Sequence, residues 1–158
     1  MKASSLSELK NELKTLGHAQ LLDICIHLAK YKKDNKELLT YLLFEAGDES
    51  AYIKSVKDLI TEQFLDINKS NTYFAKKTIR KILRTTTKYI KYSGSKQTEV
   101  ELLLFFCKNL KKSGISLQSS IALYNLYQRQ IQKIEKALST MHEDLQYDYR
   151  EELEPLLK

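Results

Sequence analysis

The residues whose types and spacing most suggest chemistry are lysines and arginines near the middle of the chain. Five of them recur at intervals of four, three, four and three residues, from Lys77 to Lys91. On an α-helix these intervals bring side chains to one face, in a stripe about 21 Å long. Aligned cations of this kind attract carboxylates or phosphates. The candidate site for an anionic partner, which we call the basic stripe, comprises Lys77, Arg80, Lys81, Arg84, Lys88 and Lys91.

The positive charge of the chain is concentrated around this stripe. Residues 67–98 contain nine basic side chains and no acidic one. The whole chain has 26 basic and 20 acidic residues, so the remainder carries 17 basic residues against 20 acidic ones. Like charges at helical spacing repel by a few tenths of a kcal/mol per pair. A helix surface that has no need for aligned positive charges would normally alternate them with glutamates.

Several interpretations of the basic stripe are open from the sequence. It could be a solvated face, or it could dock on the acidic stretch between Glu135 and Glu154 of its own chain. It could bind an acidic protein partner, in which case the chain is a non-enzymatic helical scaffold or interaction protein. The alternative is a nucleic-acid-binding protein that contacts phosphates regardless of base sequence. Tyr73, Tyr89 and Tyr92 lie nearby as candidates for stacking on exposed bases.

Other residue types form no catalytic or metal-binding pattern. Asp23 and His27 share a helix face, but two ligands do not make a zinc site, and Cys25 points away from both. The serines precede expected helices, where they cap, and there is no G-x-S-x-G elbow or phosphate-binding glycine loop. We therefore expect no enzyme activity, no metal and no cofactor.

The elements that must position the stripe are helices. Four glycines and one proline are too few for the turns of a β-sandwich or barrel. Ser5 and Glu8 fit a capping box, Gly17, Gly47, Gly94 and Gly114 are expected stops, and Asp48 or Ser50 and Ser116 are expected starts. The expected helices span about 5–16, 18–31, 38–46, 48 or 50 to 65, 70–92, 98–112, 116–141 and 143–157.

These helices predict an all-α fold of about eight antiparallel helices, paired as hairpins in an irregular bundle or a short α-solenoid. We expect one domain over residues 1–158, with a soft joint at 45–50. The sixth helix is apolar nearly all round and should be the most buried. Leucines of the first helix, from Leu6 to Leu16, share one face, and the apolar side of the second helix should face inward. Tyr124 and Tyr127 predict a packing seam, with a homodimer face as the alternative.

Cysteine usage and apolar runs bear on the compartment. Cys25 and Cys107 lie in apolar helical stretches and are expected to be reduced core thiols. The start MKASSLSELK lacks the apolar region of a signal peptide, and no run approaches the length of a membrane span. The default expectation is a cytoplasmic protein with no membrane partner.

The opening LSELKNELKTLGHAQLLDICIHLAKYKKDNKELLTYLLF resembles the start of small all-helical bacterial proteins that form a family of unknown function. The resemblance covers about a quarter of the chain and implies no activity. The segment ELKNELKTLG also resembles the beginning of a SAP DNA-binding motif. The residues after this segment depart from that motif, which has a small-residue loop before a basic helix end.

Overall fold

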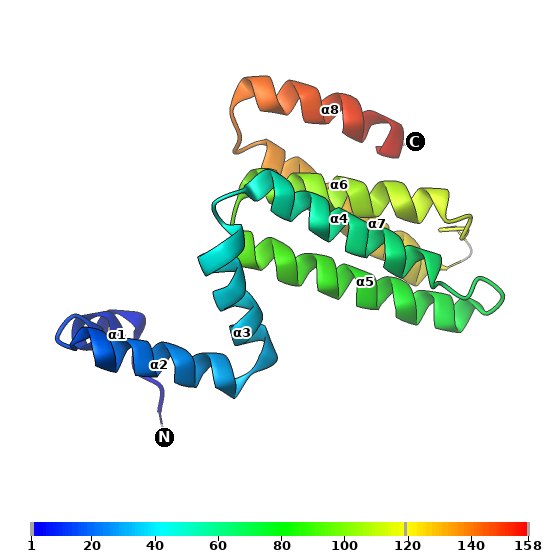
Figure 1. The fold of residues 1–158 in the computed structure, drawn as a ribbon. Helices are drawn as coiled ribbons and strands as arrows, with labels where there is room; N and C mark the ends of the chain where they lie inside the picture. Colours follow the sequence, from blue (N-terminus) through cyan, green and yellow to red (C-terminus); the bar gives the residue numbers. More distant parts are fainter. Residues whose placement is uncertain (1, 119, 158) are drawn as a thin grey trace. The chain divides into compact units, whose positions relative to one another are not determined.

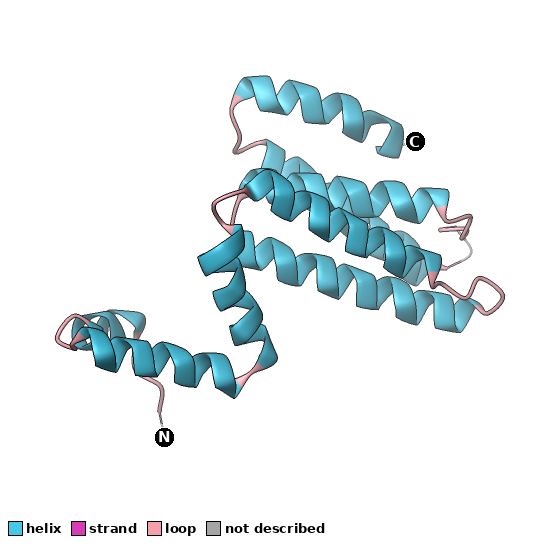
Figure 2. Cartoon of the chain, viewed as in Figure 1, coloured by secondary structure: helices cyan, strands magenta, loops and turns pink. Residues whose placement is uncertain are grey.

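A computed structural model describes residues 2–118 and 120–157. In these ranges the chain is all-α, as predicted, with eight α-helices, one short π-helical segment and no strand (Figures 1 and 2). In chain order the elements are α1 (Leu6–Leu13), α2 (His18–Tyr31), α3 (Lys33–Thr40), the π-helical η1 (Tyr41–Glu45), α4 (Glu49–Leu65), α5 (Thr72–Ser93), α6 (Lys96–Lys112), α7 (Ile121–Leu138) and α8 (Glu143–Leu157).

The chain divides into two compact units, Met1–Phe44 and Glu45–Lys158. The division falls beside residues 45–50, where the sequence predicts a soft joint. That both units fold as one domain stays a prediction.

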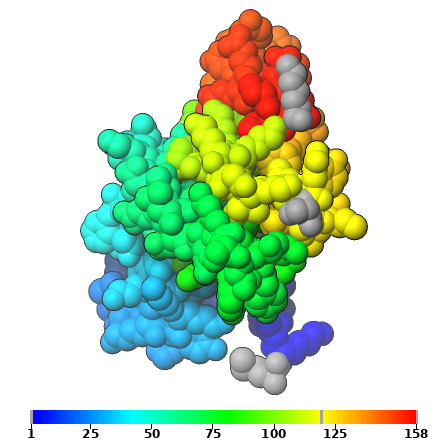
Figure 3. All heavy atoms as spheres, turned by 90° about the vertical axis from the view of Figure 1, so that its right-hand side faces the viewer, coloured from blue at the N-terminus to red at the C-terminus, as the bar shows by residue number. Residues whose placement is uncertain are grey.

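The C-terminal unit is a helical bundle centred on α6. Consecutive helices from α4 to α8 run antiparallel (Figure 1), and α6 packs against α4, α5, α7 and α8. The prediction that the sixth helix is the most buried is confirmed, since Leu102, Phe106 and Leu110 are inaccessible to solvent. Its neighbours contribute further fully buried core residues, among them Ile60, Ile79, Ile82, Leu123 and Ile134. The space-filling view shows α8, in orange and red, adjoining the yellow-green atoms of α6 and the yellow to orange atoms of α7 (Figure 3).

The N-terminal unit has no comparable core among its described residues. Within this unit α2 packs on α3, yet α1, α2 and α3 contain no buried residue. The expected inward face is therefore wrong for α2, where Leu22, Ile26 and Leu28 are exposed. The shared leucine face of α1 is uncovered as well, since Leu6, Leu9 and Leu13 are exposed. A periodic apolar face indicates which side could be covered, and helices of 8, 14 and 8 residues offer too little surface to cover it.

Local signals predict some helix ends correctly. Ser5 accepts from the Glu8 backbone, and Glu8 accepts from the Ser5 backbone at 2.7 Å, so the expected capping box is confirmed. Asp48 caps α4 by accepting from the Ala51 N–H at 3.0 Å. Gly94 ends α5 with a φ of 68°, in the left-handed region that glycine enters without steric cost.

Two other expected boundaries are wrong. Gly17 is not a left-handed stop: α1 already ends at Leu13, and Gly17 precedes α2 with an extended φ of −74°. Ser116 does not open the seventh helix, which begins five residues later at Ile121 after Ser120. Several residues near a helix end can act as its cap or its stop, as Ser116 and Ser120 both could before α7. Tertiary packing decides at which of these positions the helix begins or ends.

The two cysteines differ in environment. Both are free thiols, and Cys107 is buried as predicted, but Cys25 is exposed, so its assignment to the core is wrong. Cys25 lies on α2, whose apolar side remains uncovered. None of the helices in the described ranges has the length and apolar composition of a membrane-spanning segment.

Iodoacetamide is expected to modify Cys25 in the native protein and Cys107 only after unfolding. Burial raises the pKa of the Cys107 thiol to about 12, and only the thiolate is the nucleophile. Mass spectrometry should find one label on the native chain and two in denaturant. Rapid native labelling of both thiols would contradict the buried position of Cys107.

Candidate basic interface

The basic stripe is carried by α5, the longest helix among the described residues. Asn71 starts this helix by accepting from the N–H groups of Tyr73 and Phe74, at 2.9 and 3.2 Å. Twenty-two residues follow without a glycine or proline before Gly94. The helix is therefore continuous over the whole stripe, from Lys77 to Lys91.

The buried side of α5 fixes the direction of the stripe. Its fully covered residues are Ala75, Ile79, Ile82 and Thr86, which face α4 and α6. At about 100° per residue, the six cations fall within an arc of about 100° centred opposite these four residues. The stripe therefore points directly away from the core of the bundle. Phe74, in the first turn of α5, is 51% exposed.

Most of the stripe is open to solvent. Its exposed members are Lys77, Arg80, Lys81, Arg84 and Lys91. No ion pair involves any of these five within residues 2–118 and 120–157. Lys88 is half-buried, and its ammonium lies 5.2 Å from the centre of the Tyr89 ring and 6.0 Å from that of Tyr92. Five of the six cations are thus available to a partner.

The acidic C-terminal helix does not cover the stripe. Helix α8 packs on α6 and α7, and its Glu152 pairs with Lys108 of α6. The Tyr127 hydroxyl of α7 donates to the Leu156 carbonyl at 2.7 Å and fixes the C-terminal end of α8. In the structure, therefore, the basic stripe does not dock on α8 of its own chain. Tyr127 belongs to the predicted packing seam, whereas Tyr124 is exposed.

The three candidate stacking tyrosines have different surroundings. Tyr73 is 70% exposed and lines a surface hollow of about 530 Å³ with Lys76, Lys77, Arg80, Leu83 and Arg84. Tyr89 and Tyr92 are half-buried, and their ring centres are 5.7 Å apart. The Tyr52 hydroxyl donates to the Tyr89 carbonyl at 2.9 Å, and the two rings meet edge to face. Tyr89 and Tyr92 thus contribute to packing, and the role in base stacking remains a prediction for Tyr73.

A polar cluster that the sequence does not reveal joins three helices of the bundle. The Glu101 carboxylate of α6 accepts from the Lys57 ammonium of α4 at 2.7 Å and from the Tyr149 hydroxyl of α8 at 2.9 Å. Burial opposes ionisation of Glu101, but the hydrogen bonds from Lys57, Tyr149 and Gln97 outweigh it and lower the pKa of the carboxyl. Burial, together with the bond to Glu101, raises the pKa of Tyr149 to about 12. Both oxygens of the carboxylate are engaged, so the cluster holds helices together and offers no base.

Glu101→Gln is expected to lower the free energy of unfolding by about 1–3 kcal/mol near neutral pH, because the partly buried Lys57 loses its counter-charge. The folded-state pKa of Glu101 lies below its ordinary value of 4.5. The stabilisation is therefore present above pH 4.5 and is lost as the pH falls through the folded-state pKa. Urea unfolding of both proteins at neutral and at acidic pH measures the difference. The difference in free energy of unfolding should become smaller at acidic pH. The exposed control Glu62→Gln should show no such difference at either pH. A difference for Glu101→Gln that does not change with pH would contradict this account.

Among the residues that the structure describes, no arrangement of other groups suggests a metal centre. Within the described ranges, no three His, Cys, Asp or Glu side chains gather closely enough to hold an ion. Comparisons with protein-family models, with curated proteins and with solved structures found no match. The basic stripe is therefore the feature from which a function can be inferred.

Proposed function

We propose that the chain is a non-enzymatic interaction module that binds an acidic protein surface through the basic stripe. The observation that carries this proposal is the one-sided set of five exposed cations on α5, directed away from the core and without ion pairs among the described residues. Such an arrangement costs free energy through mutual repulsion. Binding of a partner with the opposite charge relieves this repulsion. The same positive charge disfavours contact with proteins whose surfaces are basic, so it also contributes specificity.

The spacing of the stripe favours an acidic helix in the partner. Apart from the adjacent Arg80 and Lys81, successive cations of the basic stripe are three or four residues apart, which corresponds to a rise of about 4.5–6 Å along the helix axis. Carboxylates at the same sequence intervals on a second helix have the same rise. Two such helices lying side by side can therefore pair several charges without distortion of either backbone. Because both surfaces are exposed, each pair contributes modestly and the sum depends on alignment.

Sequence-independent nucleic-acid binding is the second candidate, supported by Tyr73. This exposed ring adjoins Lys77 and Arg80 in one hollow, so a base and a phosphate could be contacted together. Tyr89 and Tyr92 are half-buried, which leaves Tyr73 as the one exposed ring of the three candidates. A single ring can stack on one base but not on several successive bases, and this weakens the nucleic-acid candidate. An acidic protein partner needs no such platform.

Fluorescence anisotropy with two anionic probes distinguishes these functions. The probes are a cross-linked helical peptide with glutamates along one face and a duplex DNA oligonucleotide with unpaired ends, which offer exposed bases to Tyr73. An interaction module should bind the peptide more tightly than the DNA at moderate salt. If DNA is preferred, and log K falls against log salt with a slope near −4.5 for five phosphate contacts, the nucleic-acid function replaces our proposal. Binding of neither probe at low salt would refute both.

A further inference from the structure

A second surface with a distinct chemistry lies in the N-terminal unit. Helices α2 and α3 and the π-helical segment line a hollow of about 560 Å³, entirely within residues 26–44. We call it the N-terminal groove. Its apolar lining includes Ile26, Leu39, Leu43 and Phe44. Phe44 is 78% exposed and Leu43 is 64% exposed. Neighbouring apolar side chains at such exposure mark interaction surfaces.

Four lysines line the same groove: Lys30, Lys32, Lys33 and Lys36. Lys33 pairs with Glu37 at 3.6 Å, and the Lys32 ammonium lies 5.7 Å from the centre of the Tyr31 ring. Lys30 and Lys36 form no ion pair in the described part of the chain. An occupant of the groove must therefore bring an apolar group to the lining and carboxylates to the lysines. A purely apolar segment or a nucleic-acid backbone satisfies only one of these requirements.

The outer face of α8 has this combination. Six carboxylates and one arginine lie within Glu143–Leu157. The buried side of the helix consists of Tyr149, Leu153 and Leu156. At about 100° per residue, the face directly opposite holds an aromatic side chain with acidic neighbours one turn away on both sides. These residues are Glu143, Asp144, Tyr147, Glu151 and Glu154.

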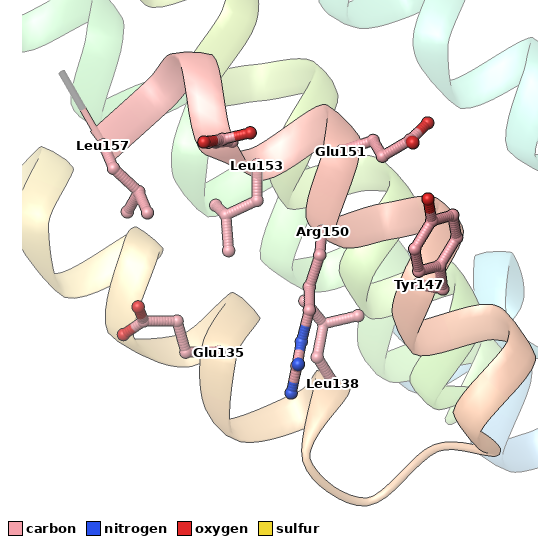
Figure 4. A pocket seen from close by; sticks show the side chains of 8 residues that line it. Glu135, Leu138, Tyr147, Arg150, Glu151, Leu153 and Leu157 are labelled. Carbon is pink, nitrogen blue, oxygen red and sulfur yellow. The ribbon is translucent and has the colours of Figure 1, made fainter.

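Tyr147 is the natural apolar anchor of this face. It is 67% exposed, and the close-up shows its ring and the Glu151 carboxylate on the same side of α8, while Arg150 extends away from both, beside Leu138 (Figure 4). Exposed tyrosines flanked by charges are typical anchors of protein interfaces, because the ring buries apolar area with little loss of side-chain entropy.

We infer that the N-terminal groove binds the outer face of α8 from a second copy of this chain. In this contact Tyr147 packs on Leu43 and Phe44, and Glu151 and Glu154 face the groove lysines. The basic stripe of α5 is a poorer receptor for the same face, because its outward arc consists of charged residues and leaves the Tyr147 ring without an apolar contact. The inference is independent of the function proposed for the stripe.

Sedimentation equilibrium of the full chain, from micromolar to millimolar concentration, tests the inference with charge-swapped variants. The unmodified protein should show an average mass that rises with concentration. Lys30→Glu with Lys36→Glu in the groove should weaken association about tenfold or more, and so should Glu151→Lys with Glu154→Lys on α8. An equimolar mixture of the two variants should regain association, since one native groove then meets one native α8. Tyr147→Ser should also weaken association, without any change of net charge.

The control is Lys54→Glu with Lys133→Glu, two exposed lysines on α4 and α7 outside both the groove and the basic stripe; it changes the net charge as much as the groove variant does and should leave association unchanged. Far-UV circular dichroism confirms that each variant keeps its helices. A protein that stays monomeric at every concentration would overturn the inference. So would association that survives both swaps, association that the mixture fails to restore, or an equal loss of association in the control variant.

Discussion

Phe106→Ala is expected to lower the free energy of unfolding by about 3–5 kcal/mol, a large fraction of the stability of an ordinary domain. The Phe106 side chain is 0% exposed at the centre of α6, and its ring centre lies 5.6 Å from that of Phe64 in α4. Truncation removes the contacts that join the central helix to its neighbour and leaves a cavity that surrounding side chains fill only in part. Guanidinium unfolding followed by circular dichroism measures the loss.

The matched control is Phe74→Ala on α5. The Phe74 ring is 51% exposed and contacts Tyr73 at the helix start, with ring centres 5.6 Å apart. Its removal should change stability by about 0.5 kcal/mol or less. Equal losses for the two phenylalanines would mean that α6 is not the centre of the bundle.

Charge reversal of the stripe is the second large effect. Lys77→Glu, Lys81→Glu and Arg84→Glu together should weaken binding of an acidic helix about 100-fold, since each reversal changes the binding free energy by about 1 kcal/mol. The helical content should not change, because all three side chains are exposed and point away from the buried side of α5. Lys88 is left unaltered because it packs on Tyr89 and Tyr92.

A control with the same net charge separates the stripe from bulk electrostatics. Lys54→Glu, Lys133→Glu and Lys136→Glu reverse three exposed lysines on α4 and α7. Binding should fall only slightly in this variant, through the weaker long-range attraction. If both triple variants lose the same affinity, the partner senses total charge and the stripe is not a docking surface.

The stripe could be predicted from the sequence because it depends on a single helix. The cations, the spacing and the absence of acidic residues all lie within 32 consecutive positions, 67–98. The helical period alone converts them into one face. The same locality explains why the Ser5 capping box and the left-handed Gly94 were predictable: each involves neighbours in the chain.

The polar cluster on α6 could not be predicted, because its members are far apart in the sequence. Lys57 and Glu101 are 44 residues apart, and Glu101 and Tyr149 are 48 apart. Each appears in the sequence as an ordinary helix residue, and only the antiparallel packing of α4, α6 and α8 brings the three together.

The errors in the N-terminal unit have a different origin. The periodicity of Leu6, Leu9 and Leu13 and the apolar surroundings of Cys25 correctly mark an amphipathic pattern. A pattern states which side is apolar, but whether the chain supplies a second surface to cover it depends on the length and number of the neighbouring helices. Here the short helices leave these side chains exposed, as they also leave Leu43 and Phe44 of the N-terminal groove.

The most direct test of the basic stripe compares two cross-linked helical peptides of identical composition. In one peptide the glutamates follow one face at intervals of three and four residues, and in the other they are distributed around the helix. Isothermal titration calorimetry should give at least about tenfold tighter binding for the first peptide, with the difference abolished in the triple variant of Lys77, Lys81 and Arg84. Equal affinities for both peptides would contradict a stripe that recognises aligned charges.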